Sequence, residues 1–343
     1  MKNNSINAIL NPRQLENFCK VFDLEPSEIE TNFDGWHKHV LMTKDKVFLF
    51  PRSPQYAKEV KQELSLYNEF SHLNSIVLPK LIKRVRDKKI SYYEFGVVTR
   101  LKGVAFSTFE ETIKLDQLRK FLTDLSEIIT TWHKIPTAEL PSVLSKPKKD
   151  QLKRITLKNW HKKALESETV EAAVDFIYAL VERITPSGLL NRELNSGTEI
   201  KKKWSAAIKE LAELKDVLVH ADVHEDQVLV DPTTLEITAV LDWEVARIDN
   251  PLWDFNFGEW GLGIWKWTNN FATLRKEMWS KYLKSRNISL STEEGLHLFF
   301  TLWEITWLVL QKKKERIPIT GTDFDKSVKI YLNKLKEIMP LLK

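Results

Sequence analysis

Apolar positions in the first hundred residues follow two spacings, and each spacing predicts its own kind of element. A spacing of three and four residues is typical of amphipathic helices. It occurs twice, once after Asn11-Pro12 and once at Val60, Leu64 and Tyr67. Short apolar runs bounded by polar residues are typical of strands. The predicted helices span residues 11–22 and 53–70, and the predicted strands span 40–42, 47–50 and 95–99.

The pattern becomes mainly helical from about residue 104 onward. A long amphipathic stripe from Leu118 to Trp132 predicts a helix that ends before Pro136. Glycine is scarce, with 10 in 343 residues, which favours helices over a glycine-rich β architecture. Further helices are predicted around residues 152–164, 168–184 and 200–214.

Composition and charge exclude several classes of function. The net charge is only +5, and the lysine clusters lie on predicted helix faces without interleaved aromatic residues, so we expect no nucleic-acid partner. The longest apolar run, Leu296–Leu310, is interrupted by Glu304 and is too short to span a bilayer. The N-terminus lacks a secretory apolar core, and the single cysteine, Cys19, cannot form an internal disulfide. We therefore expect a cytoplasmic protein without membrane spans.

The most informative stretch runs from Val217 to Asp254. A short strand, Val217–Val219, leads into a polar loop, and a hairpin of residues 228–230 and 237–241 follows and stops at Asp242-Trp243-Glu244. Two carboxylates, Asp222 and Asp242, thus lie at strand ends with the amide of Gln227 between them. Phosphoryl transfer needs one carboxylate beside the attacking hydroxyl, and it needs an amide and a second carboxylate to hold Mg²⁺ against phosphate.

Three motifs in this stretch resemble the signature of the aminoglycoside phosphotransferase family, which includes macrolide and choline kinases. They are His220-x-Asp222-x₄-Gln227, Asp242-Trp243-Glu244 and Asp249-x-Pro251-x₂-Asp254. The resemblance implies an α+β, protein-kinase-like fold of two lobes, in which a small antiparallel sheet with a helix precedes a larger, mainly helical lobe. The implied domains are an N-terminal helical extension (1–24), a nucleotide-binding N-lobe (25–102) and a catalytic and substrate-binding C-lobe (103–343).

The same resemblance implies a role for each motif residue. Asp222 matches the catalytic aspartate, and Gln227 and Asp242 match the two Mg²⁺ ligands, although the family usually has Asn where this chain has Gln227. The donor would be ATP or GTP, and the acceptor a hydroxyl group of a small molecule, either an antibiotic or a metabolic alcohol. The segment after the strand at 95–99 resembles the hinge between lobes, and the residues expected to contact the nucleobase are Val98, Thr99, Arg100, Leu101 and Lys102.

The phosphate-binding part of the N-lobe departs from the family. A cation on the third strand, two residues before a proline, contacts phosphate in the family, but here that position is Leu49. We expect Arg52 to substitute, turned inward by Pro51, and Glu63 to pair with the cation. A phosphate-covering loop is expected over residues 32–36, where Gly35 is the one glycine.

Three alternatives stay open from the sequence. The departures at Leu49 and Gln227 are compatible with a kinase-fold protein that binds nucleotide or ligand without catalysis. His220-x-Asp222-x-His224 resembles part of a metallohydrolase site but lacks further ligands at useful spacing. Eight of the twelve tryptophans lie between Trp243 and Trp307, either as helix core or as a substrate wall. Candidate acidic residues for a cationic acceptor are Glu259, Glu277 and Glu304, and the oligomeric state is not predictable.

Overall fold

The computed structural model describes ten ranges of the chain. They are residues 6–32, 37–70, 77–109, 112–140, 144, 170–184, 197–255, 268–290, 294–302 and 332–342. The chain divides into two compact units, of which the first comprises Met1–Asp124, Lys134–Ser145 and His220–Arg247, and the second comprises Leu125–His133, Lys146–Val219 and Ile248–Lys343. This division rests on compactness, and the lobe boundary at residue 102 stays a prediction.

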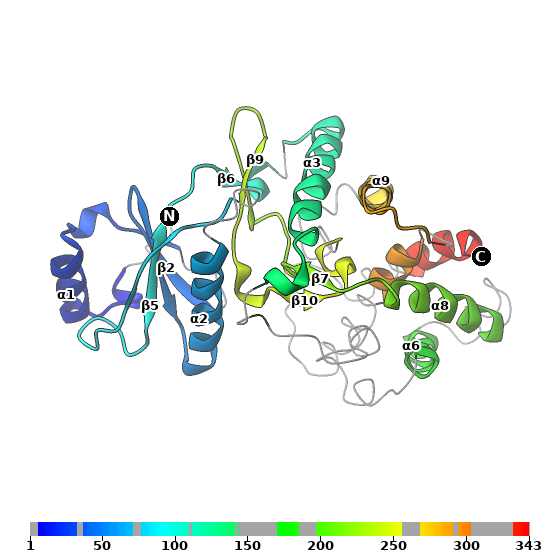
Figure 1. Cartoon of the computed structure of the whole chain (residues 1–343), viewed down its shortest axis with the longest axis horizontal. Helices are drawn as coiled ribbons and strands as arrows, with labels where there is room; N and C mark the ends of the chain where they lie inside the picture. Colours follow the sequence, from blue (N-terminus) through cyan, green and yellow to red (C-terminus); the bar gives the residue numbers. More distant parts are fainter. Residues whose placement is uncertain are drawn as a thin grey trace. The chain divides into compact units, whose positions relative to one another are not determined.

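The first unit is built on a five-stranded antiparallel sheet. Its strands run in the spatial order β1-β2-β3-β5-β4, and α1 and α2 cover its two sides (Figure 1). The strands are β1 (Glu30–Asn32), β2 (Lys38–Met42), β3 (Lys46–Pro51), β4 (Leu81–Val85) and β5 (Phe95–Thr99). The helices are α1 (Pro12–Phe22) and α2 (Pro54–Glu69). The predicted β2–β3 hairpin is confirmed, whereas the short edge strand β1 was not predicted.

Local chemistry explains where these two helices begin. Asn11 caps α1 by accepting from the backbone of Gln14, whose side chain accepts in return from the backbone of Asn11, and Pro12 occupies the first turn. Ser53 caps α2 by accepting from the backbone of Tyr56 at 3.4 Å, with proline again in the first turn. Both boundaries match the sequence prediction to within one residue.

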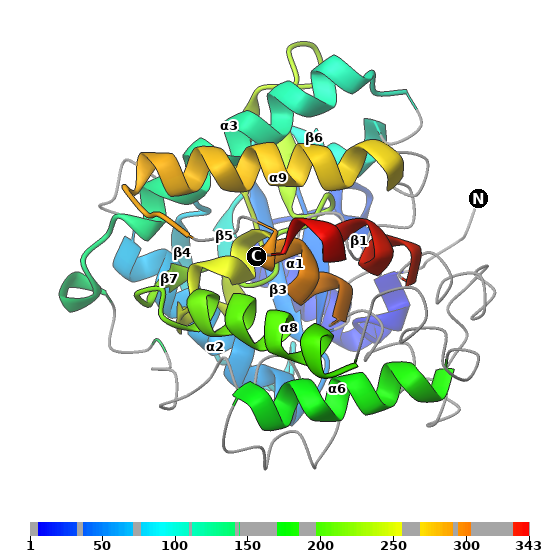
Figure 2. The ribbon, with the colours of Figure 1, turned by 90° about the vertical axis from the view of Figure 1, so that its right-hand side faces the viewer.

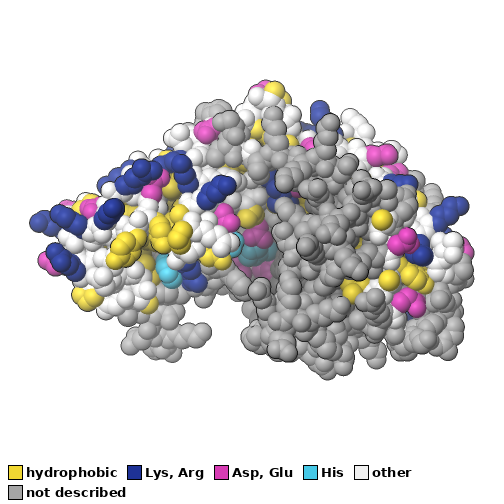
Figure 3. All heavy atoms as spheres, turned by 90° about the horizontal axis from the view of Figure 1, so that it is seen from below, with side chains coloured by type: hydrophobic (Ala, Val, Ile, Leu, Met, Phe, Trp, Pro, Cys, Tyr) yellow, Lys and Arg dark blue, Asp and Glu magenta, His cyan; other side chains and the backbone are white. Residues whose placement is uncertain are grey.

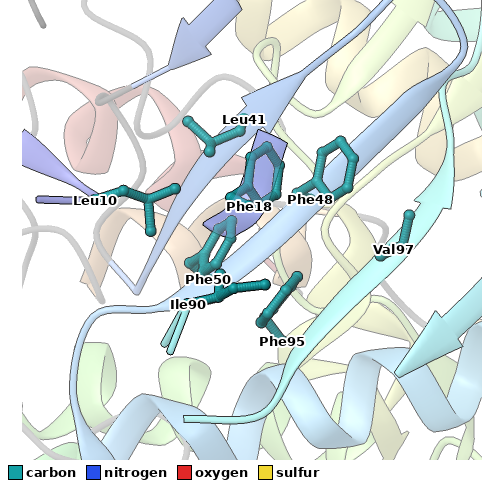
Figure 4. Close-up of a cluster of buried hydrophobic side chains, with 8 residues drawn as sticks. All are labelled: Leu10, Phe18, Leu41, Phe48, Phe50, Ile90, Phe95 and Val97. Carbon is teal, nitrogen blue, oxygen red and sulfur yellow. The ribbon is translucent and has the colours of Figure 1, made fainter. Parts of the chain in front are cut away.

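The two faces of the sheet differ in character. The face toward α1 holds a cluster of buried apolar side chains, shown in Figure 4 and composed of Leu10, Phe18, Leu41, Phe48, Phe50, Ile90, Phe95 and Val97. On the face toward α2, Gly96 leaves room for Leu64, because a Cβ at residue 96 would lie 2.2 Å from that leucine. Since side chains alternate along a strand, residues of odd and even parity on β3 contribute to different faces.

A smaller antiparallel sheet in the first unit carries the predicted motif. Its order is β6-β8-β9, with β6 (Val104–Ala105), β8 (Val228–Val230) and β9 (Ile237–Val240). Gly103 precedes β6 with φ of 123°, and a Cβ there would lie 2.6 Å from Thr238 Oγ1. Glycine is therefore required where the chain turns from β5 toward the motif hairpin.

The second unit is mainly helical. Its labelled helices are the end of α3 (Leu115–His133), α6 (Val170–Ile184), α8 (Gly197–Ala212) and α9 (Thr268–Ser285), together with the strand pair β7 (Val217–Val219) and β10 (Arg247–Asp249). Figure 2 shows α6 beside α8 and α3 beside α9, where Ser126 Oγ donates to the carbonyl of Met278 at 3.1 Å. The helix predicted at 152–164 lies outside the described residues. Within the described part of the chain, no helix combines the length and apolarity needed to cross a membrane.

A buried polar network holds the end of α3. Asp254, which has no exposed surface, accepts hydrogen bonds from Trp132 Nε1 at 2.7 Å and His133 Nε2 at 2.8 Å. The Tyr282 hydroxyl on α9 donates to the other ring nitrogen of His133 at 2.9 Å. Burial lowers the pKa of His133 despite its bond to Asp254, so the ring is neutral at physiological pH. These hydrogen bonds link α3 to Asp254 and α9 within the helical unit.

Candidate active site

The catalytic loop of the motif begins at His220, a fully buried residue. His220 Nε2 donates to the carbonyl oxygen of Leu241 at 2.7 Å, and its Nδ1 accepts from the backbone N–H of Asp222 at 3.2 Å. Ala221 between them has φ of 67°, an uncommon value for a residue with a side chain. His220 thus connects the start of the loop to the residue that precedes Asp242, and it orients the loop through these hydrogen bonds.

The two proposed metal ligands lie side by side. The backbone N–H of Leu241 donates to the carbonyl of Gln227 at 2.7 Å, and Gln227 Nε2 lies 3.1 Å from Asp242 Oδ2. Asp242 itself has φ of 68° and ψ of 56°, in the left-handed region. A non-glycine residue held there costs about 1–3 kcal/mol, and such strain is found most often at functional sites.

Lys38, at the start of β2, brings α2 and the Asp242 turn together. Its Nζ lies 2.7 Å from Glu63 Oε2, 2.5 Å from Asp242 Oδ1 and 2.9 Å from Glu244 Oε2. The lysine is 7% exposed and Glu63 is 1% exposed. On the α2 side, Tyr67 donates its hydroxyl to Glu63 Oε1 at 2.6 Å. One ammonium group is therefore shared by three carboxylates.

The protonation of this cluster follows from burial and from Lys38. Burial alone would lower the pKa of Lys38, but the three carboxylates raise it well above its ordinary value. Burial raises the pKa of Glu63 to about 7, against the opposing pull of Lys38. For Asp242, the ammonium group outweighs burial and the pKa is lowered. Asp242 is thus the carboxylate that retains its negative charge most firmly, as a metal ligand must.

Two further residues complete the contact between α2 and the Asp242 turn, and neither was predicted. Gln62 Nε2 donates to the carbonyl of Ala246 at 2.9 Å and to that of Glu244 at 3.3 Å. Glu244 also accepts from His37 Nδ1, and that ring lies 3.3 Å from Glu59. Neither Gln62 nor His37 belongs to the motifs that guided the sequence analysis.

The cation beside Glu63 differs from the expectation. We expected Arg52 to turn inward, but Arg52 is exposed and has the strand parity of Phe48 and Phe50 on the aromatic face. The structure brings Lys38 to Glu63 instead. The signal that could have found it is the register of the hairpin: Val40 pairs with Leu49, so Lys38, two residues from Val40, shares a sheet face with Leu49.

Parts of the expected hinge are already committed to hydrogen bonds within the protein. The backbone N–H of Thr99 donates to Lys80 at 3.0 Å, and that of Arg100 donates to Asp45 at 2.9 Å. The Arg100 guanidinium binds both carboxylate oxygens of Glu30 on β1, each at 3.0 Å. Val98 is buried, and Leu101 is half-buried.

Several expected site residues lie outside the described part of the chain. They are Gly35, Glu259 and Glu304. Glu277 is exposed on α9, and the described tryptophans of the predicted cluster, Trp243, Trp253 and Trp279, are buried. For these three the core interpretation holds.

The donor set around Asp242 fits a hard divalent cation. Gln227 Nε2 lies 3.1 Å from Asp242 Oδ2, and a flip of the amide would present its oxygen beside the carboxylate. Amide and carboxylate oxygens are ligands that suit Mg²⁺, completed by water and phosphate. The longer glutamine side chain therefore still reaches Asp242. Asp222, on the same loop, has a side chain that is 45% exposed and open to an incoming molecule. Figure 3 shows acidic and histidine side chains in contact near the middle of this face, while other acidic side chains are scattered over the rest of it.

This sheet-and-helix unit, with its aspartate loop, amide and left-handed aspartate, defines a phosphotransferase of the protein-kinase-like class. A model described as the phosphotransferase enzyme family matches residues 34–286, and the chain belongs to that family. The predicted family, fold and enzyme class, a small-molecule kinase, are thereby confirmed. A search of curated proteins found no match.

Solved structures with similar folds share little sequence with this chain. The GDP and kanamycin complex of APH(2")-IIIa is 14% identical, with a TM-score of 0.59 over 94% of this chain and 99% of that one. ADP-bound aminoglycoside phosphotransferase APH(2'')-Ib is 14% identical, with a TM-score of 0.53 over 96% and 99%. The macrolide 2'-phosphotransferase MphH from Brachybacterium faecium is 14% identical, with a TM-score of 0.55 over 96% and 98%.

Proposed function

We propose that this phosphotransferase moves the γ-phosphoryl group of ATP or GTP to a hydroxyl group of a small molecule in a Mg²⁺-dependent reaction in the cytoplasm. The observation that supports it best is the geometry around His220, whose ring bonds to both the Asp222 backbone and the residue before Asp242. This arrangement keeps the more exposed carboxylate of Asp222 and the half-buried, charged carboxylate of Asp242 at fixed places on one framework.

Asp222 would act on the acceptor. Its half-exposed carboxylate would accept a hydrogen bond from the acceptor hydroxyl, orient it toward the phosphorus atom and take its proton as the new P–O bond forms. The bond from phosphorus to the bridging oxygen of the nucleoside diphosphate breaks in the same step. No covalent enzyme intermediate is required, so catalysis would rest on positioning and charge neutralisation.

Gln227 and Asp242 would hold the metal ion. A Mg²⁺ ion held there would supply positive charge that neutralises the phosphate groups of the nucleotide. The protein's own contribution is to fix the two ligands, through the bond from Leu241 to the Gln227 carbonyl and through the left-handed backbone of Asp242.

The nucleobase would lie along Val98 to Lys102. The N–H groups of Thr99 and Arg100 already donate to the carbonyls of Lys80 and Asp45, so recognition of the base would fall mainly to the backbone of Leu101 and to carbonyl oxygens of the segment, each of which has two lone pairs. Structurally similar proteins are described in complexes with GDP and with ADP, which supports a purine nucleotide without choosing between the two bases.

The acceptor would be a hydroxylated antibiotic or a metabolic alcohol. Similar structures include a kanamycin complex and a macrolide phosphotransferase, which supports a bulky, oxygen-rich acceptor. Glu277, together with Glu259 and Glu304, remains a candidate for binding a cationic acceptor.

The test is phosphate transfer from labelled ATP and GTP to a panel of aminoglycosides, macrolides and small alcohols. Asp222→Asn should lower kcat by about 10³-fold or more while nucleotide affinity stays within about twofold. The matched control is Asp226→Asn on the same loop, where an aspartate that is 65% exposed should be dispensable. Equal activity of wild type and Asp222→Asn, or transfer to no acceptor, would favour the non-catalytic kinase-fold alternative.

A further inference from the structure

On β3, Leu49 occupies the position at which the family has a phosphate-binding cation, so this position provides no positive charge for phosphate. Leu49 is 5% exposed and lies opposite Gly96, on the sheet face toward α2. An apolar side chain there cannot neutralise phosphate oxygens. A nucleotide-binding site on this face therefore needs a positive charge from another strand.

Lys38 on β2 meets the geometric requirement. Val40 pairs directly with Leu49, and Lys38 is two residues from Val40, so Lys38 and Leu49 project from the same face of the sheet. The ammonium group reaches Glu63 of α2 at 2.7 Å. The positive charge beside Glu63 thus comes from β2, through Lys38, and not from β3.

Burying Lys38 and its three carboxylates costs desolvation free energy, which a purely structural role does not explain. A buried ion cluster stabilises little, because the desolvation of the charges offsets their attraction, and apolar residues of similar size often do as well. Three carboxylates around one ammonium leave an excess of negative charge. Such a site gains most from a ligand that brings its own divalent cation together with anionic groups.

Both oxygens of the proposed metal ligand are occupied in this arrangement. Lys38 Nζ lies 2.5 Å from Asp242 Oδ1, and Gln227 Nε2 lies 3.1 Å from Asp242 Oδ2. Lys38 therefore supplies at Asp242 the positive charge that a metal ion would supply. A metal ion arriving alone has to displace this ammonium group, which would then lose a partner.

We propose that Lys38 is the phosphate-binding cation of this chain, transferred from β3 to β2, and that it exchanges Asp242 for a nucleotide phosphate when metal and nucleotide bind together. The ammonium group keeps Glu63 as its anchor, while Asp242 is released to the metal ion. The exchange makes the two ligands bind cooperatively, since each provides a partner for a group that the other displaces. This inference rests on the proposed function.

The test measures metal and nucleotide separately by titration calorimetry, using Mn²⁺ alone, ATP alone and ATP with Mg²⁺. In Lys38→Met, we expect ATP with Mg²⁺ to bind about 10- to 100-fold more weakly, because a charge-assisted hydrogen bond is lost. Mn²⁺ alone should bind more tightly than to wild type, because no ammonium competes for Asp242. Arg52→Met serves as the control and should leave both affinities unchanged.

A double variant asks whether the charge itself is what matters. Lys38→Met combined with Leu49→Lys places the cation on β3. We expect this double variant to reverse at least half of the change in log Kd for the nucleotide that Lys38→Met causes. Nucleotide affinity in Lys38→Met equal to that of wild type would overturn the proposal. So would weaker binding of both Mn²⁺ and ATP, which indicates a cluster that only maintains the fold.

A labelling experiment on the wild-type chain covers the case in which Lys38→Met fails to fold. An acyl phosphate of ATP transfers its acyl group to a lysine ε-amine near the phosphates, forming an amide and releasing ATP. We expect mass spectrometry to find Lys38 labelled, and excess ATP with Mg²⁺ to protect it. Labelling of another lysine with Lys38 unmodified would overturn the proposal, whereas wild type that binds no nucleotide at all would overturn the proposed function instead.

Discussion

The two faces of the five-stranded sheet use the same strands for opposite purposes. The face toward α1 is closed by stacked and edge-on rings, including Phe50 and Phe95 at 4.3 Å between centroids. The face toward α2 buries an ammonium group among carboxylates, at Lys38 and Glu63. Neighbouring residues on a strand point to opposite faces, so alternate residues of the same strands contribute to the aromatic core and to the candidate site. The stability of the fold should therefore depend mainly on the residues that face α1, and nucleotide binding mainly on those that face α2.

The largest effect on stability is expected from the aromatic face. Phe48 is fully buried and meets Phe18 and Phe22 edge-on, both at 4.8 Å. Phe48→Ala should lower the free energy of unfolding by about 3–5 kcal/mol, through lost burial and the cavity left behind. Urea denaturation measures it. Tyr92→Ala, at a position that is 85% exposed, is the control and should change stability by less than about 0.5 kcal/mol. The nucleotide affinity of folded Phe48→Ala should match wild type; a loss would show that the faces are not independent.

A change at Glu63, on the face toward α2, is expected to impair the use of nucleotide. Glu63→Gln keeps the size of the side chain and removes the charge that holds Lys38. We expect kcat/KM for the nucleotide to fall by about tenfold, because one charge-assisted hydrogen bond is weakened. Glu69→Gln, an exposed glutamate at the end of the same helix, is the control for steady-state kinetics. Unchanged kcat/KM in Glu63→Gln would contradict a role for this face in phosphate binding.

A smaller effect should follow from the hydroxyl group behind Glu63. Tyr67→Phe removes the 2.6 Å hydrogen bond to Glu63 Oε1 and leaves a buried carboxylate oxygen without that donor. The expected loss is about 1–2 kcal/mol of unfolding free energy, read from the urea midpoint. Tyr92→Phe should have no measurable effect. If both variants behave alike, the hydroxyl group of Tyr67 does not support the cluster.

The smallest effect concerns His39, which follows Lys38 on β2 and faces the aromatic side. Burial, with the nearby charge of Arg52, lowers the pKa of His39 below its ordinary value of 6.5. The unfolded chain therefore binds more protons than the folded one below about pH 6.5, so stability should fall as the pH drops through that value. His39→Gln should remove this dependence, a difference of less than about 1 kcal/mol between pH 7.5 and 5.5. Identical pH profiles of wild type and His39→Gln in thermal unfolding would contradict it.

Most of the local structure could be predicted because its causes are local. The Asn11-Pro12 and Ser53-Pro54 helix starts and the strand Phe95–Thr99 depend on residues within a few positions of each other. The same holds for the stretch from Val217 to Asp242, where spacing alone places the aspartates at strand ends. That stretch was enough to indicate the family.

The cation could not be predicted from one strand. Its position depends on the register between β2 and β3 and on the packing of α2, which together unite residues 38, 63 and 242. Looking for a substitute next to Leu49 in the sequence led to Arg52, which has the wrong parity. The useful question was which neighbouring strand shares the face, and the Val40–Leu49 pairing answers it. Gln62 could not be predicted for the same reason, since its hydrogen bonds to Glu244 and Ala246 link segments about 180 residues apart.

The proposed function requires Asp242 and its neighbours to form a working site for metal and nucleotide. Thermal unfolding of wild type and Asp242→Ala with ATP and with GTP, each with and without Mg²⁺, tests it most directly. Ligand binding to the folded state raises the midpoint by mass action. We predict a Mg²⁺-dependent rise with at least one nucleotide in wild type and its loss in Asp242→Ala. No rise with either nucleotide, or an equal rise in both proteins, would contradict the account.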